Sequence, residues 1–245
     1  MNWQVGVTTV PSRRYTTLPK TLASLREGGF GNPRLFVDGV VDRAGYEGEV
    51  TTRWPAVHAF GNFWLGLLEM YLRDPLADLF AMFQDDVLVC RNTRQYVEES
   101  PKPCLDQPVY FNLITVKPNE DLVRGRGVGW HPSNQLGWGA QGTVFPRETM
   151  IRMFQTRHLA ERPLGMRNGV PDPARAWRNL DGGVIASVKS FGGLELVHYP
   201  SLVYHVDCPS AIGNRKDGRM VQGTWPGEVF DAMTWVEKCA EMVAG

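Results

Sequence analysis

Two short apolar runs separated by one helical stretch open the chain, and this spacing constrains the fold more than any other feature. Residues 4–10 form a β-branched run, and leucines then recur at helical spacing between residues 18 and 25. Two glycines at 28–29 can stop that helix before the second apolar run at 34–37. A strand, a helix and a strand of this minimal length predict a parallel strand pair with a right-handed crossover, and therefore an α/β domain.

The same alternation continues along the rest of the chain. We expect a helix over residues 60–72, where aromatic and leucine side chains form a helical stripe, and a buried strand at 79–83. Further strands are expected at 109–114, 143–145, 194–197 and 202–205, with helices opened by Pro146 and Asp181 and a closing amphipathic helix over 229–243. Residues 125–142 are expected to form a loop rich in glycine and tryptophan. These elements predict a single domain over residues 1–245 with a mixed, mainly parallel sheet flanked by helices. Its two lobes would cover about residues 1–100 and 101–245.

Composition narrows the possible partners. Among the 245 residues, 26 Lys and Arg balance 26 Asp and Glu, so no global field attracts nucleic acid or a membrane. Arginines are nevertheless concentrated between residues 147 and 178, either as a solvated face or as a contact for a polyanion. The four cysteines are widely spaced with no Cys-x-x-Cys pair, which argues against structural zinc and for reduced thiols. No leader-like amino terminus and no long apolar stretch is evident, so we expect a cytoplasmic protein (host cytoplasm if viral) without a membrane partner.

The most informative local feature is an acidic pair inside an apolar run. Asp85 and Asp86 are preceded by the predicted strand 79–83 and followed by Val87-Leu88-Val89. Two adjacent carboxylates are costly to bury unless a cation or hydrogen bonds compensate them. At the carboxyl end of a parallel strand they would project into the crevice where α/β sheets bind ligands. Such hard oxygen ligands suit Mg²⁺ or Mn²⁺, although a surface turn after the strand would need no function.

Gln84-Asp85-Asp86 resembles the short acidic motif of metal-dependent, nucleotide-sugar glycosyltransferases with the Rossmann-like GT-A fold. The resemblance implies that Asp86 binds the metal and that Asp85 contacts the ribose of the donor, for which a UDP-sugar is favoured. Gln84 departs from the more usual acidic residue and is assigned to the donor site by position alone.

Other segments of the first half are similar to the donor-binding parts of that family. The run of residues 5–13 resembles its first strand and nucleotide loop, which implies donor contacts from Thr8, Thr9, Pro11 and Arg13. Hydroxyl side chains and an arginine after a first strand also suit a phosphate on chemical grounds. By the same resemblance, Asp38 would lie near the base or ribose, unless it only forms an Asp-Gly turn. Asn62 resembles a donor-contacting residue at the start of the aromatic helix.

Residues 137–148 are similar to the Gly-rich acceptor loop, strand and helix of the same family. Glycines let backbone amides approach a sugar closely, and tryptophan rings offer faces for stacking. We therefore expect acceptor contacts from Trp130, Trp138, Gly139 and Gln141, with a lid over the core as the alternative for either ring.

The last site residues come from the C-terminal third. His205 ends a strand that resembles one whose histidine completes the metal shell or touches the diphosphate. Asp181 stands where the family often places its catalytic base, although a helix N-cap would explain it equally. Asp172 and Asp207 compete for that role, and a retaining mechanism would need no base. Arg215-Lys216 could clamp the diphosphate or be a solvated pair.

These features predict a glycosyltransferase that moves a sugar from a nucleoside-diphosphate sugar to a hydroxyl. In scale and motif order the chain looks similar to small viral DNA glycosyltransferases. Arginines between 124 and 178, interleaved with Trp130, Trp138 and Trp177, could hold a phosphate backbone while a base stacks. A hydroxymethylated DNA base is therefore the first expected acceptor, followed by a polysaccharide or small-molecule hydroxyl. A nucleotidyltransferase and a non-catalytic sugar- or nucleic-acid-binding module remain as alternatives.

Overall fold

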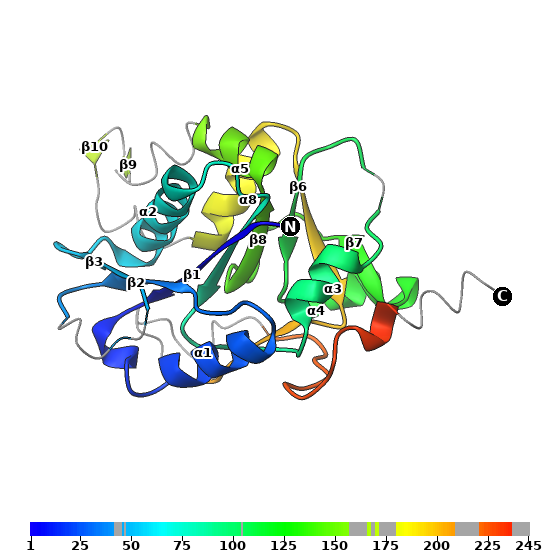
Figure 1. Ribbon diagram of the computed structural model, residues 1–245. Coiled ribbons are helices and arrows are strands. Elements are labelled where there is room, and N and C mark those ends of the chain that lie inside the picture. Colours follow the sequence, from blue (N-terminus) through cyan, green and yellow to red (C-terminus); the bar gives the residue numbers. More distant parts are fainter. Residues whose placement is uncertain are drawn as a thin grey trace.

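Eight strands form one central sheet in the computed structural model (Figure 1). The structure describes residues 1–41, 46, 48–103, 105–156, 166–167, 170–171, 180–208 and 221–236. Across the sheet the strands are β3 (Val50–Arg53), β2 (Arg34–Asp38), β1 (Trp3–Thr9), β4 (Leu79–Gln84), β8 (Gly142–Pro146), β6 (Val109–Asn112), β11 (Leu194–Tyr199) and β7 (Gly129–Pro132).

Strand directions confirm the expected mixed sheet. The four strands from β3 to β4 run parallel, and so do β6 and β11. Strand β8 is antiparallel to both of its neighbours, and β7 is antiparallel to β11 at the edge. A separate ribbon pairs β5 (Val87–Val89) with β12 (Val203–His205), and β9 (Met166–Arg167) pairs antiparallel with β10 (Val170–Pro171).

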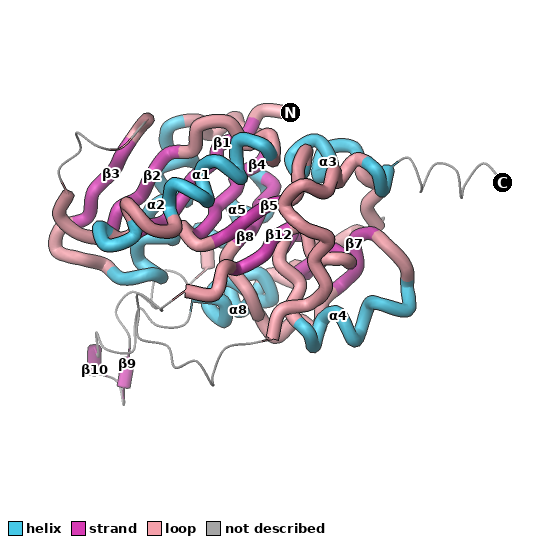
Figure 2. Tube along the Cα trace, turned by 90° about the horizontal axis from the view of Figure 1, so that it is seen from below, coloured by secondary structure: helices cyan, strands magenta, loops and turns pink. Residues whose placement is uncertain are grey.

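Helices cover both faces of the sheet. Helices α2 (His58–Arg73), α5 (Arg147–Phe154) and α8 (Leu180–Ser190) lie together on one face (Figure 1). Helix α1 (Leu18–Glu27) lies on the opposite face, next to β5, as the view from below shows (Figure 2). The smaller helices are η1 (Pro11–Arg13), α3 (Thr93–Glu99), α4 (Lys117–Val123) and η3 (Arg124–Arg126).

Strand β4 shows why two cores form around one sheet. Successive side chains of a strand point to opposite faces. Phe80 and Met82 accordingly join the cluster under α2, α5 and α8, whereas Ala81 and Phe83 join the cluster on the face of α1. Burial of each such phenylalanine contributes about 1.5–3 kcal/mol, and because both faces are covered the strand is apolar throughout.

Several elements differ from the sequence-based expectation. Strands β3 and β5 and helices α3 and α4 were not predicted, and β7 lies inside the segment expected to be a loop. Of the expected closing helix, residues 234–236 are helical and those beyond 236 lie outside the described residues. Within the described ranges, no helix has the length and apolar character needed to cross a bilayer.

Candidate functional site

The carboxyl ends of three parallel strands meet at one edge of the sheet. In the register of β1 with its neighbours, Thr8 is opposite Gln84 and Thr9 is opposite Val37. Thr9, the end of β2 and the acidic pair after β4 therefore lie side by side. This is the edge where parallel α/β sheets bind ligands.

Asp85 points back toward β1 and is only 7% exposed. The Thr9 hydroxyl donates a short hydrogen bond to one of its carboxylate oxygens. Burial raises the pKa of Asp85 to about 6, and the neighbouring charge of Asp86 adds to the shift, while Thr9 and Arg13 oppose it. The carboxylate is thus held in a place where ionisation is costly without a further partner.

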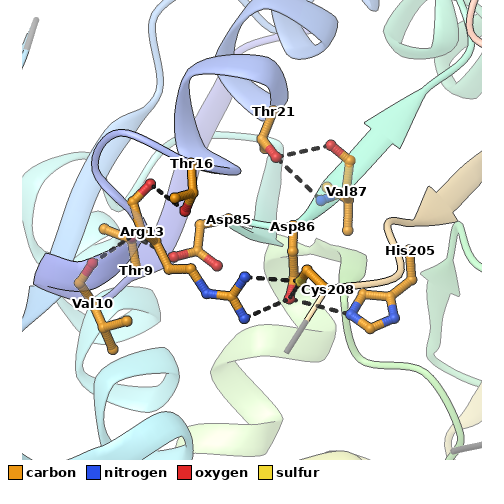
Figure 3. Close-up of polar contacts among 10 residues, drawn as sticks. All are labelled: Thr9, Val10, Arg13, Thr16, Thr21, Asp85, Asp86, Val87, His205 and Cys208. Atoms are coloured by element: carbon orange, nitrogen blue, oxygen red, sulfur yellow. Dashed lines mark hydrogen bonds and ion pairs between the residues drawn. The ribbon is translucent and has the colours of Figure 1, made fainter. Parts of the chain in front are cut away.

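Asp86 faces the opposite way, toward Arg13, His205 and Cys208 (Figure 3). Its Oδ2 atom lies 3.7 Å from Nη2 of Arg13, 3.2 Å from Nε2 of His205 and 3.6 Å from Sγ of Cys208. Burial alone would raise the pKa of Asp86, but the hydrogen bond and charge of His205, together with Arg13, hold it below its usual value. Two adjacent aspartates therefore have opposite environments, one favouring the proton and the other the charge.

Backbone pairing fixes His205 beside Asp86. The β5–β12 ribbon places His205 opposite Val87, and the amide of Val206 donates to the carbonyl of Asp86 at 2.8 Å. The other side of β5 is held by helix α1. There the Thr21 hydroxyl bonds both the carbonyl and the amide of Val87, at 2.9 and 3.1 Å (Figure 3).

Ser24 repeats this contact one turn along α1. Its hydroxyl donates to the carbonyl of Val89 at 3.3 Å and accepts from the amide of the same residue at 2.8 Å. Two helix side chains thus satisfy the backbone groups that a neighbouring strand would otherwise pair.

Asp86 and His205 have the chemistry and spacing for a divalent cation. Two adjacent ligands of an octahedral Mg²⁺-sized ion lie about 3 Å apart, close to the 3.2 Å between Oδ2 of Asp86 and Nε2 of His205. The Oδ1 atom of Asp86 is buried and has no hydrogen-bond partner among the described residues. Across those same ranges no three His, Cys, Asp or Glu side chains are grouped to hold a metal, so an ion here needs further ligands from elsewhere.

The Gly-rich loop of the second half is tied to Asp181. The amides of Gly139 and Ala140 donate to its two carboxylate oxygens at 2.9 and 3.2 Å. Burial raises the pKa of Asp181, against the effect of these amides and of the charge of His205. Asp181 thus holds the loop in place and keeps a raised affinity for a proton within the electrostatic reach of His205.

Trp138 and Gln141 flank the same loop. The amide of Gln84 donates to the carbonyl of Gln141 at 2.9 Å, which joins the loop to the end of β4. Nε1 of Trp138 and Oε1 of Gln141 are buried and lack a hydrogen-bond partner within the described part of the chain. Buried polar atoms in this condition are uncommon in proteins, and an ordered water or a bound polar group would satisfy them.

The position of Trp130 contradicts the expected contact of its ring with an acceptor. It lies on β7, is 4% exposed, donates from its indole nitrogen to Ser100 at 2.8 Å, and packs edge-on against Phe111. The ring belongs to the core, as the lid alternative anticipated, and offers no face to an acceptor.

Three further residues expected at the donor site each have one structural partner, and their contacts with a donor stay predictions. Asn62 is buried and donates from Nδ2 to the carbonyl of Phe36 at 2.7 Å, which joins α2 to β2, while its Oδ1 atom has no hydrogen-bond partner within the described part of the chain. Asp38 accepts the amide of Val57 at 2.7 Å and fixes the approach to α2. Thr8 donates to the carbonyl of Phe83 at 3.3 Å.

The remaining site predictions divide by location. Pro11 opens η1, where its ring lies against Gly39, and is exposed at the edge of the site. Asp207 is exposed next to His205. Asp172, Trp177 and Arg215-Lys216 lie outside the described residues.

Sequence reasoning missed two contributors. Cys208, counted only as a reduced thiol, contacts both Asp86 and Arg13, and its spacing of three from His205 was the available signal. Glu195 is fully buried on β11, where it accepts from Tyr110 at 2.6 Å and from Asn112 at 2.9 Å. Asn112 also donates to the carbonyl of Trp138 at 2.8 Å, so this network supports the Gly-rich loop.

Comparisons with solved structures address the fold. The chain is similar to GalNAc-T7 solved with UDP, GalNAc and Mn²⁺, with a TM-score of 0.52 and 12% identity over 84% of this chain and 45% of that one. It is also similar to Drosophila β1,4-galactosyltransferase 7 in complex with xylobiose (TM-score 0.42, 14% identity, 96% and 79% covered). A third is A197 from STIV (TM-score 0.41, 15% identity, 91% and 95% covered).

This chain therefore spans less than half the length of GalNAc-T7, and the likeness identifies the GT-A fold that the acidic motif predicted. No family model matches the sequence, and no curated protein matches it.

Proposed function

We propose that the chain is a metal-dependent glycosyltransferase that moves a sugar from a nucleoside-diphosphate sugar, with a UDP-sugar favoured, to a hydroxyl acceptor. The observation that carries this proposal is the convergence of Asp85, Asp86, Arg13 and His205 at the carboxyl edge of a GT-A sheet. Nucleotide sugars carry a diphosphate, which needs positive charge as it leaves.

Residues of the first half bind the donor in this proposal. Asp85, oriented by Thr9, accepts a ribose hydroxyl, and that hydrogen bond stabilises its buried charge. Arg13 extends from η1 toward the same site and holds the phosphates as a bidentate donor. Gln84 and Pro11 border this donor site, whereas Thr8, Asp38 and Asn62 support it through the contacts described above.

Asp86 and His205 would hold a Mn²⁺ or Mg²⁺ ion, with Cys208 adjacent. Such an ion stabilises the developing charge of the nucleoside diphosphate when it is bound there. The lowered pKa of Asp86 keeps its carboxylate ionised at neutral pH, which suits a ligand for a hard cation.

Asp181 is the base if the reaction inverts the sugar's configuration. The acceptor oxygen forms a bond to the anomeric carbon, the bond to the diphosphate breaks, and the acceptor's proton passes to a carboxylate oxygen of Asp181. Its two amide partners fix the orientation of the carboxylate, and its raised pKa favours uptake of the proton.

The acceptor lies along the Gly-rich loop, near Trp138, Gly139 and Gln141. The unpartnered polar atoms of Trp138 and Gln141 suit the hydroxyls of a carbohydrate. Because the chain has an arginine-rich segment, a hydroxymethylated DNA base is the first acceptor to test. The burial of Trp130 removes one of the rings expected to stack on that base.

The test is release of nucleoside diphosphate from a panel of nucleotide sugars, with Mn²⁺ or with chelator. Hydroxymethylated DNA, unmodified DNA and simple sugars are supplied as acceptors. We expect turnover that requires metal and is lost in Asp86→Ala. If the reaction inverts the configuration of the sugar, turnover should also be reduced at least about 10²-fold in Asp181→Asn. Pyrophosphate release would indicate a nucleotidyltransferase, and binding of sugar or DNA without turnover would indicate a binding module.

A further inference from the structure

Arg13 is a buried cation held against the carboxylate assigned to the metal. Its side chain is 9% exposed and belongs to η1, directly after β1. Its Nη2 atom lies 3.7 Å from Oδ2 of Asp86, and its Nη1 atom donates to Sγ of Cys208 at 2.8 Å. His205 approaches the same Oδ2 atom at 3.2 Å, so the guanidinium and the imidazole share one oxygen (Figure 3).

This arrangement sets Arg13 against a metal ion at Asp86. Two positive charges a few ångströms apart in a buried site repel each other strongly, because little water is present to screen them. The carboxylate therefore accommodates either the guanidinium at this distance or a divalent cation with the guanidinium moved away.

One described contact of Arg13 is weaker than the contacts that a phosphate offers to a guanidinium. A thiol is a weak hydrogen-bond acceptor, so Cys208 contributes little to holding the guanidinium. Phosphate oxygens accept two parallel hydrogen bonds from arginine and form stronger, charge-assisted contacts.

We propose that Arg13 occupies the cation position beside Asp86 in the nucleotide-free protein. A nucleoside diphosphate then frees Asp86 for the metal, because its phosphate oxygens accept the hydrogen bonds of the guanidinium. This inference deepens the proposed function and rests on its assignment of the donor site. It makes Arg13 a positioning residue that couples metal binding to donor binding. Without nucleotide, the protein has low affinity for the metal. The metal and the nucleoside diphosphate each raise the affinity for the other by the same factor.

Mn²⁺ binding measured by electron paramagnetic resonance of the free ion tests the coupling without any turnover. Wild type, Arg13→Gln, Arg13→Lys and Asp86→Asn are titrated with Mn²⁺ at about pH 7.5, each with and without UDP. Without UDP, we expect Arg13→Gln to bind Mn²⁺ at least about fivefold more tightly than wild type, the lower end of common couplings. Arg13→Lys keeps the charge and should stay close to wild type, while Asp86→Asn should lose the site.

With UDP, the affinity of the wild type for Mn²⁺ should rise more than that of Arg13→Gln, because only the wild type has a guanidinium to remove. Arg94→Gln is the matched control: it removes one arginine from α3, where Arg94 pairs with Glu98, and should leave Mn²⁺ binding unchanged. Circular dichroism establishes that each variant is folded. If Arg13→Gln does not fold, a wild-type affinity for Mn²⁺ that UDP does not raise overturns the proposal.

Equal or weaker Mn²⁺ binding by folded Arg13→Gln without UDP also overturns it, as does Mn²⁺ binding that is indistinguishable between wild type and Asp86→Asn. Failure of the proposed function would look different. In that case neither UDP nor a nucleotide sugar would bind, yet the comparison of Arg13→Gln with wild type in Mn²⁺ alone would still decide whether Arg13 opposes the cation.

Discussion

Replacing Asp85 by asparagine should stabilise the protein at neutral pH. Burial raises the pKa of Asp85 from 3.8 to about 6, and a shift of this size corresponds to about 3 kcal/mol at 1.36 kcal/mol per unit. The folded state therefore binds this proton more tightly than the unfolded chain. The bound proton therefore stabilises the folded state fully below the pKa of the unfolded chain, near pH 4. This contribution to the free energy of unfolding is lost as the pH rises through about 6. Asparagine avoids this loss, and the Thr9 hydroxyl can still donate to its amide oxygen.

Denaturant unfolding of both proteins between about pH 4 and 7.5, with chelator present, measures the difference. At pH 7.5 we expect Asp85→Asn to be more stable by up to about 3 kcal/mol, and at pH 4.5 this advantage should shrink by about 2 kcal/mol. Other titrating groups cancel because they are common to both proteins. Asp86→Asn is the contrasting variant, since it loses the contacts with His205 and Arg13 and should be less stable than wild type at about pH 7.5.

A stability difference between Asp85→Asn and wild type that does not vary with pH would refute this reasoning. So would a variant that is destabilised at neutral pH. Confirmation would mean that the site retains a destabilising carboxylate, which is common where a residue is kept for function.

Three further predictions concern the core around the site. Gly137→Ala should cost roughly 1–3 kcal/mol in calorimetry, because φ is +70° and a Cβ atom would lie 2.3 Å from Ile185. Gly125→Ala, where a Cβ meets open space, should stay within about 0.5 kcal/mol, and equal costs for the two would contradict the packing argument. Trp130→Ala should cost about 3–5 kcal/mol in denaturant unfolding, and a cost below about 1 kcal/mol would argue against its place in the core. Burial lowers the pKa of His198 to about 3, so its NMR signals should not titrate from about pH 8 to 4.5. The free energy of unfolding should fall as the pH drops below about 6.5, because the unfolded chain then binds a proton that the folded state does not. A titration midpoint of the His198 signals above about pH 5 would be incompatible with this burial.

Features set by local pattern were predictable from the sequence. The unit from β1 to β2 and the stripe of α2 have apolar residues at the period of their element, and both lie within a residue or two of the expected bounds. The acidic pair was placed correctly at the end of β4, because a buried strand that runs into two carboxylates has to end where those charges can meet solvent or a partner. The pairing of β1 with β4, which the structure supplies, then brings Thr9 and Asp85 together.

Features set by distant partners were not predictable. Trp130 lies in a glycine-rich segment, and only the antiparallel pairing of β7 with β11 makes that segment a buried strand. Strand β5 has three residues, too few to show a period. The contact of Cys208 with Asp86 spans 122 positions, and the spacing of three between His205 and Cys208 points to Asp86 only once β12 has paired with β5.

The hydroxyls of Thr21 and Ser24 have a consequence for anyone who transplants the acidic motif to another scaffold. They form hydrogen bonds with the amide and carbonyl groups of Val87 and Val89, so helix α1 fixes the position of β5 and of Asp86 just before it. A graft of residues 83–89 alone would leave these four backbone groups unpaired, and the aspartate would lose its fixed position relative to the sheet. The smallest portable unit is the acidic motif together with α1, two segments separated by about 55 residues of sequence that behave as one part.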